Sequence, residues 1–329
     1  MNDVIDAARH LARAPGTLIS ELTHATGLSH EGVVLGLAEH LETDATADEI
    51  AALVTHASEA PHVHVVLSAN VFVAGLRAIA LAVAAAPEVT IRASSREPHF
   101  ARALVARMTM PGVRVTPEAR PEGVKRGEIH VYGRNETIAA VRATAAAGVT
   151  VRGHGAGMGV AIVSAGADVV ASASAVARDV IAFDQRGCLS PRLVFVPPAA
   201  GPEFAAALSG ALEALGRIVP RGALQADEAA EAERYASTVA FAGHLLRGAG
   251  HLVGFATSVV VPPPGRHLHV VAADDLAVRS SVAKLARSIV AVGASHPEAV
   301  ARWAPPHARL SRLGTMQQPR LDGPVDRRT

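Results

Sequence analysis

The side chain best suited to covalent chemistry in this sequence of 329 residues is its single thiol, Cys188. Small and apolar residues repeat at helical spacing before it, over residues 168–182, and a short apolar run over residues 192–196 indicates a buried strand after it. Cys188 is therefore predicted to lie on a short turn between a helix and a strand, where a rigid scaffold can present a reactive group. A thiolate in that position is a candidate nucleophile; an inert, small apolar side chain is the alternative.

A histidine in a glycine-rich segment is the second candidate. His154 lies within residues 153–159, where glycine occupies every second position. The segment follows a predicted strand, but no register gives G-x-G-x-x-G, and residues 160–163 indicate another strand instead of a phosphate-binding helix. We expect these glycines to let the backbone pass close to a ligand or to another strand. His154 itself is a candidate for proton transfer, with a structural histidine as the alternative.

Polar side chains also follow the predicted strands of the first half of the chain. In a parallel sheet the carboxyl ends of the strands meet at one edge, where ligands bind. The guanidinium and hydroxyl groups of residues 92–96 suit a phosphate, with a solvated turn as the alternative. Asn70 ends a strand in the same way, and a local turn is its default role. The ligand-binding candidates at this edge are Ser68, Arg92, Ser94, Ser95, Gly133 and Asn135.

The elements that must position these residues alternate between strand and helix from about residue 62. This alternation predicts an α/β protein with a doubly wound parallel sheet and helices on both faces. A second α/β segment follows from about residue 160, with strands expected at 258–261, 268–271 and 289–292 and long helices at 203–216 and 226–244. Residues 1–60 indicate short helices, with a capping box from Thr46 to Glu49. The expected division is 1–60, 61–159, 160–300 and a tail over 301–329.

Composition narrows the partners. Thirty-one basic and thirty acidic side chains give a formal net charge of +1 without a basic stripe, which argues against nucleic acid or an anionic membrane. The sequence shows no metal-ligand spacing, and one cysteine cannot form a thiolate metal site, so no metal is expected. The apolar stretches are interrupted by charge, serine or glycine, so no membrane span is expected, and a cytoplasmic location fits the single thiol.

Three segments together carry a resemblance. Residues 68–76 and 89–98 give a strand, turn and helix followed by a second strand, and residues 183–191 contain the cysteine. In this order they resemble the aldehyde dehydrogenase superfamily, and most of all the acyl-CoA reductase family typified by the fatty-acid reductase of bacterial luminescence. Residues 312–323 resemble the C-terminal signature of that family. The likeness extends over about residues 62–326.

The resemblance implies an NADP-type Rossmann domain packed against a catalytic domain, with Cys188 as the nucleophile. Asn70 matches the oxyanion asparagine, and Arg92 replaces a lysine that touches the adenosine ribose. Ser95 stands where NAD-preferring members often carry a carboxylate, which favours NADPH, although NADH stays open. His154 replaces the general-base glutamate of the hydrolytic relatives, which fits acyl transfer involving coenzyme A better than hydrolysis. Ser68, Ser94, Gly133 and Asn135 complete the expected cofactor contacts.

The expected reaction is NADPH-dependent reduction of an acyl-CoA or acyl-carrier-protein thioester to the aldehyde, through an acyl group on Cys188. Two alternatives remain open: an NAD(P)-dependent aldehyde dehydrogenase that forms free acid, and a non-catalytic family member that acts as a partner subunit. Arg92, Ala93 and the short chain support the second alternative. A homo-oligomer or an acyl-transferase partner is compatible with both the reductase and the aldehyde dehydrogenase activity.

Overall fold

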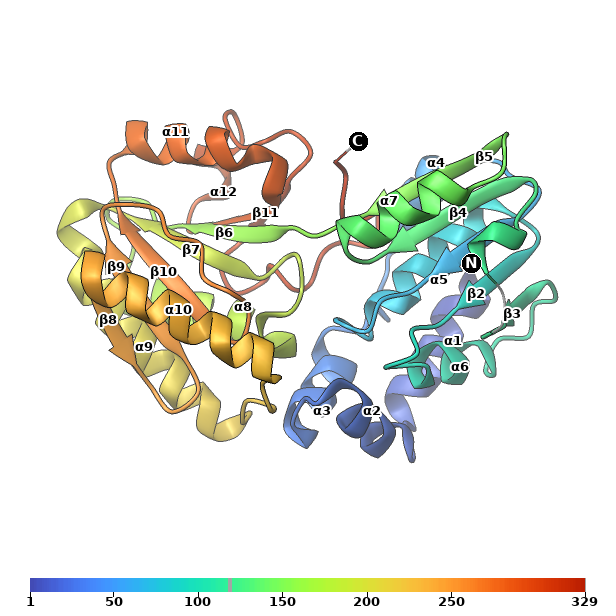
Figure 1. The fold of residues 1–329 in the computed structure, drawn as a ribbon, viewed down its shortest axis with the longest axis horizontal. Helices are drawn as coiled ribbons and strands as arrows, with labels where there is room; N and C mark the ends of the chain where they lie inside the picture. The colour runs from blue at the N-terminus through green and yellow to red at the C-terminus, as the bar shows by residue number, and fades with distance from the viewer. Residues whose placement is uncertain (118–119, 329) are drawn as a thin grey trace. The chain divides into compact units, whose positions relative to one another are not determined.

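In the computed structural model, residues 1–117 and 120–328 are described. The chain folds into two compact units (Figure 1). Unit 1 consists of residues 1–26, 33–156 and 320–326, and unit 2 of residues 27–32, 157–319 and 327–329. The chain therefore passes from one unit to the other after the glycine-rich segment begins, between Ala156 and Gly157.

Unit 1 is built on a five-stranded parallel sheet with the order β3-β2-β1-β4-β5. Its strands are β1 (Val63–Val66), β2 (Val89–Arg92), β3 (Val113–Val115), β4 (Gly127–Tyr132) and β5 (Val149–His154). The order runs outwards from β1 in both directions, so the sheet is doubly wound as predicted. All five carboxyl ends meet at one edge.

Helices cover both faces of this sheet. Its connections are α5 (Ala74–Ala85), α6 (His99–Val105) and α7 (Asn135–Thr144). Right-handed crossovers that proceed in opposite directions must place their helices on opposite faces. Accordingly, α7 packs with Ile129 and Val131. Helix α5 contacts β1 and also packs against α4 (Ala47–His56) and α1 (Asn2–Arg13). The remaining helix of this unit is α2 (Leu18–Thr26); α3 (His30–Glu39) begins in residues grouped with unit 2.

Unit 2 contains a seven-stranded sheet with the order β12-β11-β6-β7-β10-β9-β8. The strands are β6 (Met158–Ile162), β7 (Pro191–Val196), β8 (His244–Arg247), β9 (Leu252–Ala256), β10 (His267–Ala272), β11 (Ile289–Ala294) and β12 (Arg309–Arg312). All neighbours pair in parallel except β8, which is antiparallel to β9 at one edge. The second α/β segment is thus present, with a mixed sheet.

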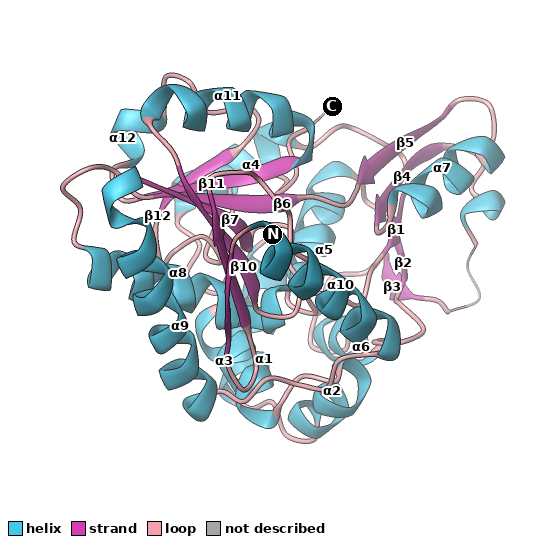
Figure 2. Cartoon of the chain, turned by 60° about the vertical axis from the view of Figure 1, so that its left-hand side comes forward, coloured by secondary structure: helices cyan, strands magenta, loops and turns pink. Residues whose placement is uncertain are grey.

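The helices of unit 2 also form two layers (Figure 2). They are α8 (Val169–Ile181), α9 (Gly201–Ile218), α10 (Ala226–Ala242), α11 (Asp275–Leu285) and α12 (Pro297–Val300). Helix α11 packs on the face that carries Val160 and Leu193. Helix α9 lies on the opposite face. Phe255 shares that face with Val270, its partner on β10. The Phe255 ring fills the space that a side chain at Gly201, the first residue of α9, would need.

One predicted strand of the second segment is wrong. Residues 258–261 form no strand; the chain instead pairs earlier, as the β8–β9 hairpin. The apolar run at 259–261 precedes three prolines, which have no N–H group to donate to a ladder. Val259 and Val261 are accordingly left 37% and 43% exposed. The C-terminal tail also contains more regular structure than its weak periodicity indicated, because β12 lies within it.

The first 60 residues are helical as expected. The predicted capping box is present: the Thr46 hydroxyl accepts a hydrogen bond from Glu49 N, and the Glu49 carboxylate accepts one from Thr46 N. By their contacts these helices group with the parallel sheet in unit 1, and β6 begins at Met158, just before the boundary expected at residue 159. No helix among the described residues is long and apolar enough to cross a bilayer.

Candidate functional site

The carboxyl edge of the unit 1 sheet gathers the residues expected to bind a ligand. Ser68 and Asn70 follow β1, Arg92 ends β2 with Ser94 and Ser95 behind it, and Gly133 and Asn135 follow β4. His154 ends β5 at the same edge. Strands far apart in the sequence, such as β1 and β5, thus end at the same edge, as the parallel topology requires. Cys188 belongs to unit 2 and is described separately below.

Two helices begin at this edge with no side chain capping them. Neither α5 nor α7 has a side-chain hydrogen bond to its first backbone N–H groups. In α5 the first three of these groups donate instead to the carbonyls of residues 71–73, in the preceding turn. N–H groups at the start of a helix attract anions, and the helix dipole reinforces that preference. The start of α7 therefore offers this edge of unit 1 donors suited to a phosphate.

Asn70 is oriented by an arginine. Its carbonyl oxygen Oδ1 accepts a hydrogen bond of 3.3 Å from Arg96 Nη2. The amide NH₂ group of Asn70 is left to donate elsewhere, which is the orientation that stabilisation of an oxyanion needs. The sequence predicts Arg96 only as part of a possible phosphate-binding cluster.

The cluster after β2 presents hydroxyl and guanidinium groups. Ser94 Oγ accepts a hydrogen bond from Arg96 N at 3.3 Å, and Arg92 and Ser94 are both half-buried. The next carboxylate along the chain, Glu97, accepts a hydrogen bond from Phe100 N and is buried. It serves the first turn of α6, and burial raises its pKa.

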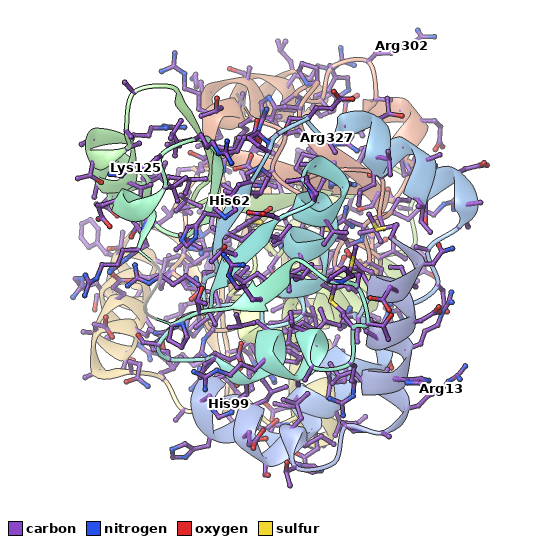
Figure 3. The ribbon with its side chains drawn as sticks, turned by 90° about the vertical axis from the view of Figure 1, so that its right-hand side faces the viewer. Arg13, His62, His99, Lys125, Arg302 and Arg327 are labelled. Atoms are coloured by element: carbon purple, nitrogen blue, oxygen red, sulfur yellow. The ribbon has the colours of Figure 1, made fainter. Side chains whose placement is uncertain are left out.

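The lysine of unit 1, Lys125, does not take the place of Arg92. It lies exposed just before β4, at the amino edge of the sheet (Figure 3). Arg92 instead ends β2, at the carboxyl edge. Arg92 is thus the basic side chain that β2 itself presents where the resemblance implies a ribose contact.

His154 lies among aromatic and charged side chains. Its ring stacks on Tyr132 with centroids 4.4 Å apart, and the His130 ring lies 6.5 Å away. Burial and the neighbouring His130 lower the pKa of His154 to about 4. The imidazole is therefore neutral at pH 7 and is a weaker base than an unperturbed histidine.

An ion-pair network centred on the buried Glu128 joins β4 to β5. Glu128 on β4 accepts hydrogen bonds from Arg152 Nε and Nη2 at 2.7 and 2.8 Å and from Ser58 Oγ at 2.8 Å, and contacts His130 Nε2 at 2.9 Å. Burial opposes ionisation of Glu128, but these hydrogen bonds outweigh it and hold its pKa far below the usual range. The network links β4 to β5 and explains why charged residues occupy this face of the sheet.

The glycine-rich segment passes close to its neighbours, as predicted. A Cβ atom at Gly153 would lie 2.5 Å from Ile138 of α7, and one at Gly159 would lie 2.3 Å from the carbonyl oxygen of Leu189. The contact at Gly159 brings the start of β6 against the loop that carries Cys188. Gly159 N donates to the carbonyl of Ser190 in the same place, at 2.9 Å.

The loop before Cys188 contains a left-handed turn that the sequence did not reveal. Phe183, Asp184 and Gln185 have φ angles of 53°, 51° and 63°. A left-handed conformation costs an L-residue about 1–2 kcal/mol, and none of the three is glycine. Such backbone strain persists only where surrounding contacts impose it, and it concentrates at functional sites.

The contacts that impose this conformation come from β10 and the turn before it. Asp184 forms a buried ion pair with Arg266, with Oδ1 2.8 Å from Nε and 2.7 Å from Nη2. Gln185 donates to the carbonyls of Pro191 and His267 and accepts from His267 N at 2.7 Å. Cys188 follows three residues later, half-buried, on the turn that leads into β7. The predicted placement of the thiol on a turn between helix and strand is confirmed.

A second carboxylate anchors the C-terminal segment. Asp179, near the end of α8, accepts hydrogen bonds from Gly314 N at 2.7 Å and Met316 N at 2.8 Å. Burial raises its pKa to about 7 even though these bonds favour the charged form. The segment that resembled a family signature is therefore fastened to the helix that leads to the cysteine loop. Nothing in its local sequence pattern indicated this role for Asp179.

Comparison with known protein families gives the clearest result. A sequence model described as acyl-CoA reductase (LuxC) matches residues 126–302, which is more than half of the chain and includes the cysteine loop. The chain belongs to the acyl-CoA reductase (LuxC) family. The family suggested by residues 68–98, 183–191 and 312–323 is thereby confirmed. No curated protein sequence matches the chain directly.

Solved structures share the fold of this acyl-CoA reductase family member. Proline utilization A from Bradyrhizobium japonicum superposes with a TM-score of 0.70 at 15% identity, over 97% of this chain and 38% of that one. The NAD-dependent benzaldehyde dehydrogenase of Corynebacterium glutamicum gives 0.72 at 15% identity, over 94% and 80%. NADP-dependent glyceraldehyde-3-phosphate dehydrogenase from Bacillus halodurans, solved with NADP, gives 0.69 at 13%, over 95% and 77%. The chain thus has the aldehyde dehydrogenase fold and spans little more than a third of the first of these proteins.

Among the described residues, no group of three or more His, Cys, Asp or Glu side chains could hold a metal ion.

Proposed function

We propose that this protein reduces an acyl thioester to the aldehyde with NADPH, through an acyl group carried on Cys188. The observation that carries the proposal is the cysteine loop: a thiol three residues after a strained turn, inside the region matched by the acyl-CoA reductase family. A cysteine kept only for packing would not need buried polar contacts to hold the preceding backbone in a left-handed conformation.

The proposed first step is attack of the Cys188 thiolate on the thioester carbonyl. A carbon–sulfur bond forms, the carbonyl π electrons move to oxygen, and collapse of this oxyanion expels the carrier thiolate, leaving an acyl-cysteine. The Cys188 backbone N–H and the Asn70 amide are the proposed donors to the oxyanion, each typically worth ~3 kcal/mol. The Arg96 bond to Asn70 Oδ1 supports this role for Asn70, because it directs the amide N–H groups away from Arg96.

The carboxyl edge of unit 1 is the proposed cofactor site. When bound, NADPH would supply the hydride that converts the acyl-cysteine to a hemithioacetal. The uncapped start of α7 suits its diphosphate, with Gly133 and Asn135 beside it and Ser68 at the same edge of the sheet. Arg92, Ser94 and Ser95 are assigned to the 2′-phosphate, because they provide donors while Glu97 is engaged with α6.

His154 is the proposed proton acceptor. With a pKa of about 4 it is neutral at pH 7 and can accept a proton from Cys188 or deliver one through water, although it is a weak base. Stacking on Tyr132 fixes the plane of the ring.

The decisive experiment uses the fact that Cys188 is the only thiol. Incubation with an acyl-CoA but no NADPH should add one acyl group to the intact mass, and NADPH should then release the aldehyde. Cys188→Ala should lose both labelling and turnover. Ser190→Ala is the matched control, because its hydroxyl is buried on the same loop with no hydrogen-bond partner among the described residues. Normal reductase activity of Cys188→Ala would refute the covalent mechanism.

A further inference from the structure

Unit 2 contains a cavity that the proposed reaction has not used. It has a volume of ≈ 330 Å³ and lies among the carboxyl-terminal half of α9, residues 220–224 and residues 249–251. Its walls combine apolar side chains, such as Leu212 and Leu224, with three arginines. A cavity of this size is at the lower end of the range for small-molecule sites.

The charge lining this cavity is predominantly positive. Arg217, Arg221 and Arg266 face one lining carboxylate, Glu213, and the charge of Arg266 is already matched by Asp184 behind it. His251 adds no charge at pH 7, because burial lowers its pKa. Arg266 also donates to the carbonyls of Val219 and Pro220, which offsets the negative end of α9. One positive charge therefore remains without a counterion.

Arg221 is the side chain that carries this unmatched charge. It is half-buried, and its Nη1 donates to the carbonyls of Gly250 and Gly265 at 3.1 and 3.3 Å. In the described part of the chain no carboxylate lies within ion-pair distance of Arg221. Its guanidinium is thus held in place by neutral oxygens at the cavity wall, while Arg217, with its side chain 77% exposed, stands at the rim. Two neighbouring arginines, one held by neutral oxygens and the other paired with Glu213 at 3.8 Å, are an arrangement suited to a phosphate.

The cavity wall is joined to the loop that carries the thiol. Gly222 N donates to Asp184 Oδ2 at 2.9 Å, and Arg186 Nη2 donates to the carbonyl of Ala223 at 3.3 Å. Cys188 follows Arg186 by two residues, so the loop that carries the thiol and the cavity wall share structural supports.

We propose that this cavity binds a phosphate group of the acyl donor, so that Arg221 and Arg217 hold the carrier end while the thioester reaches Cys188. The inference rests on the proposed function. A phosphorylated pantetheine arm is common to coenzyme A and to acyl-carrier proteins, and its length and flexibility separate the phosphate from the thioester sulfur. The phosphate is the chemistry recognised, whichever carrier supplies it.

The test is calorimetric titration of the full-length protein in the presence of NADPH, which keeps the cofactor site filled. The ligands are coenzyme A, 4′-phosphopantetheine and phosphate-free pantetheine. Arg221→Gln and Arg217→Gln should each weaken coenzyme A binding, the former by about tenfold or more, as loss of a charge-assisted hydrogen bond predicts. Arg234→Gln is the control, because Arg234 lies exposed on α10 outside the cavity. Pantetheine should bind all variants alike.

The two phosphorylated ligands separate the possible donors. If both depend on Arg221, the cavity holds the phosphate on the pantetheine arm, which a carrier protein also presents. If coenzyme A alone depends on Arg221, the cavity holds the adenosine end and coenzyme A is the donor. Coenzyme A affinities in Arg221→Gln and Arg217→Gln equal to that of the control would overturn the proposal, and circular dichroism verifies that each variant is folded.

Binding and catalysis report on different claims. If coenzyme A binding depends on Arg221 but no acyl-CoA is ever reduced, the cavity assignment stands and the proposed reaction fails. If acyl-CoA is reduced with an unchanged KM in Arg221→Gln, the reaction stands and the cavity assignment fails.

Discussion

The buried ion pair between Asp184 and Arg266 provides a sharp test of how the nucleophile loop is built. The two side chains are 2% and 3% exposed, and the carboxylate oxygen Oδ1 contacts two guanidinium nitrogens. Asp184→Asn removes the negative charge but keeps a residue that tolerates a φ of 51°. The backbone cost therefore stays nearly constant, and the variant reports on the loss of the carboxylate, which pairs with Arg266 and accepts a hydrogen bond from Gly222 N.

Removal of one partner leaves the Arg266 guanidinium buried without its counterion. A change of this kind typically costs about 3–5 kcal/mol. For a unit of this size the midpoint of thermal unfolding should fall by roughly 6–20 °C. Urea unfolding monitored by circular dichroism measures the free energy directly. Reaction of Cys188 with iodoacetamide should become faster, because the loop has lost one of its supports.

Two further variants define the interpretation. The double variant Asp184→Asn with Arg266→Gln removes both charges and should recover part of the lost stability. Glu231→Gln disrupts an exposed ion pair of α10, with a separation of 3.9 Å, and should change stability by less than about 0.5 kcal/mol. If Asp184→Asn unfolds within about 1 kcal/mol of the wild type, the ion pair does not hold the loop and the reasoning is wrong.

Four other variants test the remaining assignments. Arg92→Ala should narrow the difference in affinity between NADPH and NADH measured by calorimetry; equal wild-type affinities would remove the basis for a 2′-phosphate site. His154→Ala should lower turnover about 100-fold while NADPH affinity is kept. The activity of the wild type should fall as the pH drops through about 4, where His154 becomes protonated. His154→Glu should produce some free acid. The pKa of Asp179 is about 7 in the folded protein and 3.8 in the unfolded chain. Between these pH values the native state keeps a proton that the unfolded state has released. The free energy of unfolding should therefore decrease as the pH rises from about 4 to 7. Asp179→Asn should remove that decrease in urea titrations at pH 5 and pH 8, and an unchanged slope would contradict the assignment.

The first strands of the unit 1 sheet could be predicted because they are short apolar runs separated by a segment with helical periodicity. The strands predicted at 63–67 and 88–92 lie within one residue of the observed ends of β1 and β2. Strands were predicted wrongly where strand pairing depends on the neighbouring strand and not on the composition of the strand itself. The run at 258–261 has the residues of a strand but is followed by prolines, whereas β8 is mostly exposed and is stabilised by its antiparallel contact with β9.

The cysteine could be singled out from the sequence, but its supports could not. Asp184 is the only carboxylate in residues 180–202, and aspartate tolerates a left-handed conformation, which is the one local signal present. Its partner Arg266 lies 82 residues further along the chain. Asp179 likewise binds a segment 135 residues away. Such pairings are fixed by the order of strands in the sheet, and no spacing within either segment encodes them.

These long-range supports imply an order of assembly for the nucleophile loop. Three consecutive left-handed residues cost about 3–6 kcal/mol together. The offsetting contacts come from Arg266 and His267 at the start of β10, which pairs with β7. The loop can therefore adopt its geometry only after β7 and β10 have paired. Presentation of Cys188 is thus a property of the assembled sheet, and a substitution that weakens this pairing should disturb the thiol even when it lies far from residue 188.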